Sequence, residues 1–494
     1  MKRRASFEGS SLTEQNTRRM RLQANAMLNA SPFDPTPLAK FILNLKQKPA
    51  NIDQNDLMAV LEVIFTNLLK RESLEPQALQ WDSLYTETWS LLLERIGSSS
   101  QVETQMALKV CMSLIKGEAE SPVVEGDWPI GKLKSILEIL INGPERTIVL
   151  KEFGKYTKCL DVLNLAIKFA LELAPTGDYQ HDTIKAMNYL SLVNQLDLGK
   201  AVLSAQKYHV DTNKSHRSFT YEKARKKLNK IWRGIFASSN GIDEDLHRMV
   251  LVVLLERILP HMEDPIGVTD FLMNSLHEYD GPIALLALQG IFVLMQKQNI
   301  TYPDVYEKLY QMFHARVFTN KYKSRLFYLA DIFLTSTHLP ENLVAAFVKR
   351  LARLALKSPP KDAVIMIRFI CNLLLRHTGL QKLIRGDPLA EQVTDPYNEK
   401  EKDPVKTEAL NSSLWELHFL QKNAIPEVAN AATFINNPLP IMEFDLGPLL
   451  DVEDSRIFDD LLKSKAKQYM LSYENTKTLA LAKNDTVTKH FDLV

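Results

Sequence analysis

The sequence predicts an all-α protein of the HEAT/armadillo-like helical-repeat solenoid class, and three observations support this. Apolar residues recur at helical spacing along most of the chain, and no stretch shows sustained strand alternation. Glycine is scarce, at 17 residues. Helix-like segments begin near Asp243, Ile283, Tyr322 and Lys361, each about 39 residues after the last. Helical hairpins at such a period are typical of HEAT repeats, although an irregular helical array with accidental spacing is the alternative.

Residues 1–30 are predicted to form a flexible basic tail, because their arginines and lysines far outnumber Glu8 and Glu14. A nuclear-import signal is one interpretation of this tail, and an ordinary basic tail is the other. Residues 31–240 follow as an N-terminal helical region. Its first convincing helix, from Asn51 to Lys70, places Leu57 and Leu61 in register with two further apolar residues.

Residues 241–440 are predicted to form the repeat domain. Partner helices near Asp264, Pro303 and Glu341 lie between the periodic segments. Such hairpins cannot bury their apolar faces alone and must stack on neighbours.

The stretch from Leu339 to His377 is central to that domain. Pro340 suits a helix start, and the apolar residues that follow form one helical stripe. Four cations share the opposite arc: Lys349, Arg350, Arg353 and Lys357. They have two interpretations, since they could receive an acidic partner segment or hold the chain's own acidic loop and tail. A second helix, from Asp362 to Arg376, is apolar almost all round and is expected to be an inner helix.

Residues 385–408 are predicted to be a long acidic loop, because three Asp-Pro pairs interrupt the helical pattern. Helix is expected to return at Thr407 to Leu420, carrying Trp415, and again from Pro426. Trp415 is read either as an anchor of this last helical pair or as an exposed contact residue. Residues 441–494 form a C-terminal acidic and apolar tail, expected to lie extended before a short helix near Arg456 to Met470.

The same residues carry a resemblance to a known family. The segment LVAAFVKRLARLAL, followed by Ser358-Pro359-Pro360, resembles the signature of the CCAAT-binding-factor-like family of nucleolar assembly proteins. Three further blocks are similar to one branch of that family: Tyr322 to Leu339, Asp395-Pro396-Tyr397 and Ser412 to Leu417. The resemblance covers roughly residues 281–450.

The resemblance implies a protein of the nucleus and nucleolus that acts as a scaffold in small ribosomal subunit assembly and pre-rRNA processing. It further implies a complex with nucleolar protein 14 and contact with the pre-ribosomal particle. A partner-binding hypothesis follows for the residues that the resemblance reaches: Lys349, Arg350, Arg353, Lys357, Asp395, Pro396, Tyr397 and Trp415.

A basic segment from Lys207 to Arg233 is the best candidate for contact with pre-rRNA. Cations there neutralise phosphates, and interleaved aromatic residues can stack on unpaired bases. The alternative is that Trp232 is a core residue and the lysines form a solvated face. The RNA-binding hypothesis names Lys223, Lys226, Lys227, Lys230 and Arg233.

Composition and motifs exclude other classes. A formal net charge of +1 provides no global attraction to nucleic acid. Three separated cysteines, Cys111, Cys159 and Cys371, indicate reduced core thiols in a cytosolic or nuclear setting. No signal peptide is expected, and the best membrane candidate, residues 283–295, is too short to span a bilayer.

No HExxH, CxxC, Walker loop, GxGxxG or GxSxG motif occurs, so we expect no enzyme activity, no cofactor and no metal. Two alternatives from other classes stay open. A karyopherin-type nuclear transport adaptor would also be a helical solenoid, but should be longer, more acidic and continuous in its repeats. A nucleic-acid-binding transcription cofactor should carry a recognition helix or a zinc finger.

Overall fold

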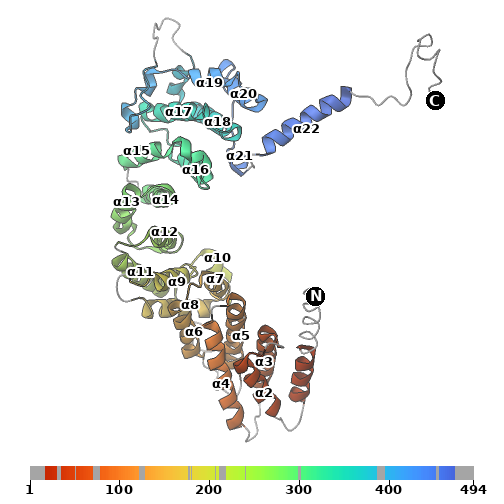
Figure 1. The fold of residues 1–494 in the computed structure, drawn as a ribbon. Coiled ribbons are helices and arrows are strands. Elements are labelled where there is room, and N and C mark those ends of the chain that lie inside the picture. Colours follow the sequence, from red (N-terminus) through yellow and green to blue (C-terminus); the bar gives the residue numbers. More distant parts are fainter. Residues whose placement is uncertain are drawn as a thin grey trace, which may run out of the picture. The chain divides into compact units, whose positions relative to one another are not determined.

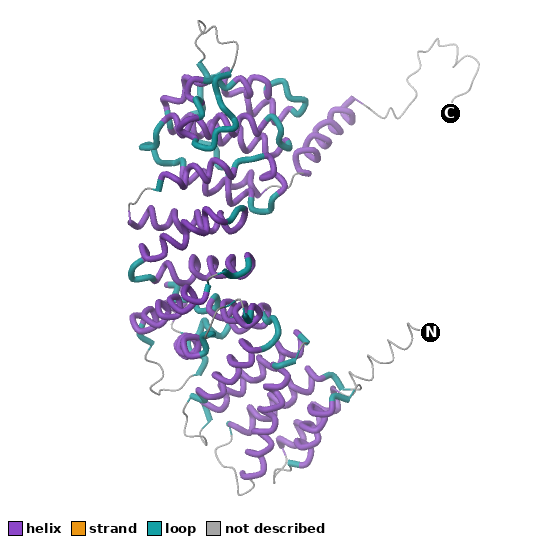
Figure 2. The backbone as a smooth tube through the Cα atoms, turned by 60° about the vertical axis from the view of Figure 1, so that its left-hand side comes forward, coloured by secondary structure: helices purple, strands orange, loops and turns teal. Residues whose placement is uncertain are grey.

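A computed structural model describes most of the chain, and every regular element in it is a helix (Figures 1 and 2). This confirms the all-α helical-repeat class. The described residues are 17–29, 35–49, 52–70, 78–98, 100–121, 128–175, 179, 181–205, 207–210, 219–239, 241–298, 302–385, 395–451 and 455–472. The chain divides into two compact units, Met1–Ser275 and Leu276–Val494.

The first unit is a series of helices that pack against their near neighbours in sequence. Helix α5 packs on α3 and α4, α9 on α6, α7 and α12, and α11 on α8. The bounds are α2 Thr36–Gln47, α3 Gln54–Leu69, α4 Ala78–Ile96, α5 Gln101–Ala119, α6 Ile130–Asn142, α7 Thr147–Phe153, α8 Leu160–Glu172, α9 Thr183–Val193, α10 Lys200–Ala205, α11 Tyr221–Ser238 and α12 Glu244–Val253, continued by η2 Leu254–Ile258, η3 Leu259–His261 and η4 Pro265–Val268.

The start of the first unit corrects the predicted basic tail. Residues 17–29 are helical, and Met20, Ala24 and Met27 on this helix are buried. Thr17 also donates a hydrogen bond to Asp56 at 2.8 Å. The tail prediction is therefore wrong for residues 17–29, because an apolar stripe ties them to the helices that follow. Residues 1–16, with the suggested import signal, lie outside the described residues.

The carboxylate of Asp161, at the start of α8, fixes the chain before α11. It accepts hydrogen bonds from the backbone N–H groups of His209 at 3.0 Å and Val210 at 3.1 Å, and from the indole N–H of Trp128 at 3.3 Å. Asp161 is buried, so these donors are satisfied away from water.

The second unit holds the remaining repeats and the C-terminal elements. Helices α17 and α18 pack on each other, α20 packs on α18, and α19 packs on α17. The bounds are α14 Gly281–Gln298, α15 Pro303–Met312, η5 Ala315–Thr319, α16 Lys323–Phe333, α17 Glu341–Ala355, α18 Pro360–Arg376, η6 Thr378–Leu383, η7 Pro404–Lys406, η8 Ala409–Asn411, α19 Trp415–Leu420, α20 Pro426–Ala431, η9 Ala432–Asn436, α21 Gly447–Asp451 and α22 Ser455–Ser472.

The predicted repeat period is confirmed by the helix starts. Helices α12, α14, α16 and α18 begin at Glu244, Gly281, Lys323 and Pro360, and α15 and α17 begin at Pro303 and Glu341. Helix α18 is buried along most of its length, as expected of an inner helix.

The division between the units falls inside α13 (Thr269–Glu278), later than the boundary predicted at residue 241. The reason lies in side-chain contacts. The Phe271 ring lies 5.9 Å from that of Trp232 on α11, and the His247 ring bonds Ser275 at 2.9 Å. The first predicted repeat thus packs with the N-terminal region.

One predicted helix is shorter than expected. The chain from Thr407 to Leu414 is not a continuous helix, and α19 begins only at Trp415. Glu408 takes the left-handed conformation with φ 56°, which breaks the helical path. The carbonyl of Thr407 instead accepts a hydrogen bond from the Asn398 N–H at 2.9 Å, so the loop closes on itself.

Candidate partner-binding site

Lys349, on the predicted cationic arc of α17, is fully buried and paired inside the chain. Its Nζ lies 2.7 Å from Glu416 Oε1 and 2.9 Å from Asp395 Oδ2, and it donates to the carbonyl of Ser413 at 2.6 Å. The lysine side chain is 0% exposed. A buried cation requires such partners, since an unpaired charge in the interior is very costly.

Arg353, one turn further along α17, completes the same network. Its guanidinium lies 2.7 Å from Asp395 and 2.8 Å from Glu416, and it stacks 4.7 Å from the ring centroid of Trp415. The Trp415 indole N–H and the Ser412 hydroxyl also donate to Asp395, at 2.9 and 2.5 Å. We call Lys349, Arg353, Asp395, Trp415 and Glu416 the α17 clamp.

The two carboxylates of the clamp respond to burial in opposite ways. Burial opposes ionisation of Asp395, but hydrogen bonds from Lys349, Ser412 and Trp415 outweigh it and hold the pKa of this carboxyl well below its usual range. Burial of Glu416 raises the pKa of that carboxyl, against the attraction of Lys349 and Arg353. Asp395 is therefore a stable anion at the centre of the network.

The other two predicted cations also contact the loop: Arg350 lies on α17, and Lys357 lies in the turn just after the helix ends at Ala355. The Arg350 guanidinium donates to the carbonyls of Phe313 at 2.6 Å and Glu399 at 3.3 Å. Lys357 lies 3.8 Å from the Glu399 carboxylate and is 65% exposed. The loop is held further by the buried Tyr397, whose hydroxyl lies 2.7 Å from that of Tyr310.

The structure thus selects one of the two interpretations of the cationic arc: it holds the chain's own loop. Pro396 is half-buried, and in the sequence it lies between Asp395 and Tyr397, which both contact other parts of this unit. Both interpretations of Trp415 hold in part. It is an anchor, because its indole N–H donates to Asp395, and its side chain is also 39% exposed. Partner binding through these residues stays a prediction, and Lys357 and Trp415 are the members with the most exposed surface. Residues 386–394 of the predicted acidic loop lie outside the described residues.

Residues 438–446, which we call the C-terminal strap, are tied to α18 by two sets of contacts. Arg376 forms a bidentate pair with Glu443, at 2.6 and 2.9 Å. The buried Asn372 carboxamide donates to the carbonyl of Phe444 and accepts from its N–H, both at 2.8 Å. The predicted extended course before the last helix is thereby seen in the structure.

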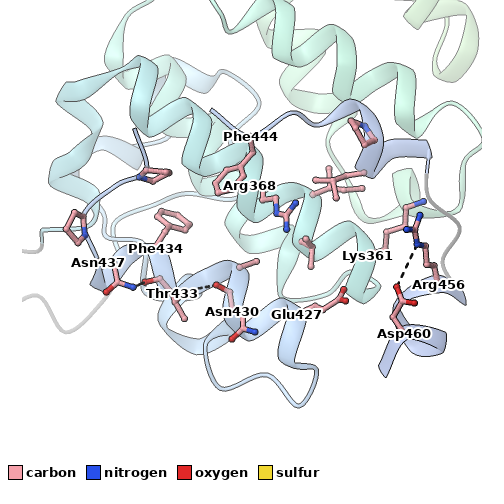
Figure 3. Close-up of a pocket in the computed structure, with 17 residues that line it drawn as sticks. Lys361, Arg368, Glu427, Asn430, Thr433, Phe434, Asn437, Phe444, Arg456 and Asp460 are labelled. Carbon is pink, nitrogen blue, oxygen red and sulfur yellow. Dashed lines mark hydrogen bonds and ion pairs between the residues drawn. The ribbon is translucent and has the colours of Figure 1, made fainter. Parts of the chain in front are cut away.

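Between α18, α20, η9, the strap and the start of α22 lies a groove of about 800 Å³ (Figure 3). Val364 and Ile365 of α18 line it together with Phe434 and Phe444, and the Arg368 guanidinium lies 5.3 Å from the Phe444 ring centroid. Charged and polar residues also line it: Lys361, Glu427, Asn430, Asn437, Arg456 and Asp460. We call this cavity the strap groove.

Two exposed apolar residues adjoin the strap groove in sequence. Ile441 is fully exposed and Met442 is 79% exposed, although Glu443 and Phe444, which follow them directly, are tied to α18. The neighbouring Pro440 and Phe444 line the groove itself. Contiguous exposed apolar surface beside a groove is typical of a protein contact site.

The predicted RNA-binding residues lie on α11 in the first unit. Lys223, Lys226, Lys230 and Arg233 are exposed, whereas Lys227 is half-buried. Burial, with the nearby Lys168, lowers the pKa of Lys227. Trp232 is buried, as the alternative interpretation stated.

Three observations concern metal binding, membrane crossing and thiol reactivity in the described part of the chain. No group of three His, Cys, Asp or Glu side chains there is placed to hold a metal ion. None of the described helices combines the length and apolar character that crossing a bilayer requires. The thiol of Cys371 is buried, which raises its pKa to about 12 and disfavours the reactive thiolate at neutral pH.

Sequence reasoning missed two residues that build this site. Glu416 is the buried partner of Lys349, and its only local signal is a carboxylate set among Leu414, Leu417 and Leu420. Asn372, which holds the strap, lies inside an apolar helix, where a lone carboxamide indicates a specific hydrogen-bond partner. Neither signal identifies that partner.

Comparison with known proteins defines the class. The CBF/Mak21 family matches residues 284–432, which contain both α17 and the α17 clamp. Nucleolar complex protein 4 homolog B of Xenopus laevis is 33% identical over 421 residues, covering 82% of this chain and 80% of the relative. The human homolog is 32% identical over 423 residues, covering 83% and 81%. Nucleolar complex protein 4 of Saccharomyces cerevisiae is 28% identical over 467 residues, covering 86% and 82%.

The chain belongs to the nucleolar complex protein 4 branch of the CBF/Mak21 family. The family resemblance drawn from the LVAAFVKRLARLAL segment and its companion blocks is thereby confirmed. Membership assigns the protein to the nucleus and nucleolus, with a role in ribosome biogenesis.

Proposed function

We propose that the protein is a non-catalytic scaffold of small ribosomal subunit assembly and pre-rRNA processing, and that it works in complex with a nucleolar protein 14 homologue. The observation that carries the proposal is the strap groove. Its lining combines apolar side chains with charged and polar ones, as the surface of a protein interface does. A segment of the partner is expected to occupy this groove.

The geometry favours a peptide segment over a small molecule. The groove has no cluster of catalytic or metal-binding side chains among the described residues, and three prolines of the strap and α21 line it. Ile441 and Met442 extend the apolar surface beyond its edge. A long partner segment can cover both surfaces at once, which a small ligand cannot.

The test is co-purification of the tagged chain with the nucleolar protein 14 homologue after nuclease treatment. The variant Phe444→Ala/Arg368→Glu is expected to weaken partner binding at least about tenfold, because it removes an aromatic contact and reverses a charge in the groove. Phe419→Ala is the matched control, since Phe419 is exposed but does not line the groove. Equal partner recovery with both variants would contradict the assignment of the groove.

The cellular readout is the processing of pre-rRNA. Depletion of the protein should cause small-subunit rRNA precursors to accumulate while large-subunit precursors mature normally. Rescue by the Phe419→Ala variant and failure of rescue by the groove variant would link the phenotype to the partner. Dependence of the complex on a small GTPase would instead favour the karyopherin-type alternative, and release by nuclease would favour the nucleic-acid-binding cofactor.

A further inference from the structure

The exposed cations of α11 form one stripe along the helix. Lys223, Lys226, Lys230 and Arg233 follow each other at spacings of three and four residues, which places them on one face over about 15 Å. All four are exposed, and in the described residues no carboxylate lies within ion-pair distance of them. We call this set the α11 stripe.

The α11 stripe faces solvent because the opposite face of α11 is part of the core. Ala224, Leu228, Ile231 and Ile235 on that face are almost completely buried. The helix packs with this face on α8 and its neighbours. The four cations are therefore held toward solvent by a rigid element, and their spacing does not depend on a loop.

A pocket of about 330 Å³ lies at the C-terminal end of the stripe. Arg233 belongs both to the stripe and to the wall of the pocket, beside Trp232 and Phe236 of the same helix. The Phe236 side chain is 47% exposed, and its ring packs against that of Phe271 in an edge arrangement, with the ring centroids 5.8 Å apart. An exposed but supported aromatic ring is suited to stacking.

Apart from the Arg233 guanidinium, which the pocket shares with the α11 stripe, three polar residues of the pocket offer acceptor oxygens. The Oδ1 atom of Asn229 is buried in the pocket wall and accepts no hydrogen bond from the described residues. Glu263 and Asp264, from the turn before η4, line the other side. Such a set disfavours an anionic group inside the pocket, but it accepts hydrogen bonds from the amino and imino groups of a nucleobase.

We propose that α11 and this pocket form a binding site for single-stranded RNA. The α11 stripe holds successive phosphates, and one unstacked base enters the pocket against Phe236 with its amino group toward Asn229. A duplex does not fit this site, because its bases are not free to enter a pocket. An acidic peptide would pair with the stripe, but its carboxylates would be repelled by the acceptors of the pocket.

This proposal deepens the role in pre-rRNA processing proposed above, and its test needs no partner protein. Binding of the purified chain to a labelled 12-nucleotide single-stranded RNA is followed by fluorescence anisotropy at several salt concentrations. The comparison probes are an RNA duplex, an abasic sugar–phosphate strand and a poly-glutamate peptide. We expect the single-stranded RNA to bind most tightly.

Two variants separate the phosphate contacts from the base contact. Lys226→Ala/Lys230→Ala should weaken binding to every strand and reduce the slope of log affinity against log salt by about 1.4, at about 0.7 for each lost phosphate contact. Phe236→Ala should weaken RNA binding about 5-fold or more without changing that slope or the affinity for the abasic strand. Phe236→Tyr keeps the ring and should retain binding.

The matched control is Lys109→Ala/Lys151→Ala, which makes the same charge change at two exposed lysines away from α11. Equal binding of the abasic strand, the poly-glutamate peptide and the RNA would overturn the base pocket. An unchanged affinity in the stripe variant, with its helical circular dichroism intact, would overturn the whole site. Neither result affects co-purification with the partner protein, so the two proposals fail separately.

Discussion

The Nζ atom of Lys349 lies 2.7 Å from Oε1 of Glu416, and neither side chain is exposed to solvent. Lys349 belongs to α17, while Glu416 follows the long loop that begins after η6. The pair joins two segments far apart in the sequence, and Asp395 and Arg353 complete the charge balance around it. The loop is therefore fixed by charge pairing in the interior as well as by apolar packing.

Replacement of Lys349 by methionine is expected to lower the free energy of unfolding of the second unit by about 3–5 kcal/mol, because Arg353 alone would be left to balance the two carboxylates of Asp395 and the buried Glu416. The loss of unfolding free energy is measured by chemical denaturation. Hydrogen exchange of the amides in residues 395–416 shows whether the loop loosens. Lys357→Met, at an exposed position just after the end of α17, should cost less than about 1 kcal/mol. Similar losses for both variants would contradict the interior pairing.

The depressed pKa of Asp395 gives a pH dependence with a definite sign. An acid whose folded pKa is depressed contributes stability above its unfolded pKa, and this contribution is lost as pH falls through the folded pKa. Asp395→Asn should therefore lower the free energy of unfolding by about 3 kcal/mol at pH 7. The difference in unfolding free energy between the variant and the parent chain should become smaller below about pH 4, where aspartate in the unfolded chain gains a proton.

The raised pKa of Glu416 gives a pH dependence of the opposite sign, because ionisation of this buried carboxyl lowers the free energy of unfolding as the pH rises. Glu416→Gln should accordingly not show the narrowing deficit of Asp395→Asn at low pH. The measurement is the difference in free energy of unfolding between each variant and the parent chain from pH 7 to pH 3. A constant deficit for Asp395→Asn across that range would rule out the charge network as its cause.

Substitution of Asn372 by leucine should release the C-terminal strap while α18 stays folded. The change removes both hydrogen bonds to Phe444, including the acceptor for its N–H. Exchange of the Phe444 amide should accelerate about 5- to 30-fold, which corresponds to about 1–2 kcal/mol. Asn411→Leu, at an exposed turn, is the control and should leave exchange in the strap unchanged.

Replacement of Asp161 by asparagine tests the segment before α11. One oxygen would be replaced by an NH₂ group facing backbone donors, so the first unit should lose about 1–3 kcal/mol and the His209 and Val210 amides should exchange faster. Asp182→Asn is the matched control, because asparagine caps a helix such as α9 as well as aspartate does. Unchanged exchange at both amides would contradict the anchoring role of Asp161.

The sequence predicted the helices better than their tertiary partners. The starts of α12, α14, α16 and α18 follow from local periodicity, which neighbouring residues determine. The cationic arc of α17 was visible for the same reason. Its partner Glu416 was not, because a buried ion pair across 67 residues leaves no local pattern. The same applies to the strap groove, which is lined by residues of α18, α20, η9, the strap, α21 and α22.

Local reasoning was wrong where tertiary contacts override composition. Residues 17–29 look basic and polar, but three buried side chains at helical spacing decide their structure. The segment after Thr407 has helix-forming residues, but Glu408 turns the chain so that Asp395 and Glu416 can both reach α17.

Because Lys349 is buried, the LVAAFVKRLARLAL motif is evidence about the internal structure of a protein that contains it, and not about its binding surface. A residue that touches only its own chain preserves the shape of the domain, and the shape can be kept while the outer surface diverges. Two proteins could thus share this motif in full and still associate with different molecules. Differences in binding between such relatives should be sought in outward-facing side chains such as Ile441 and Met442, rather than in the motif itself.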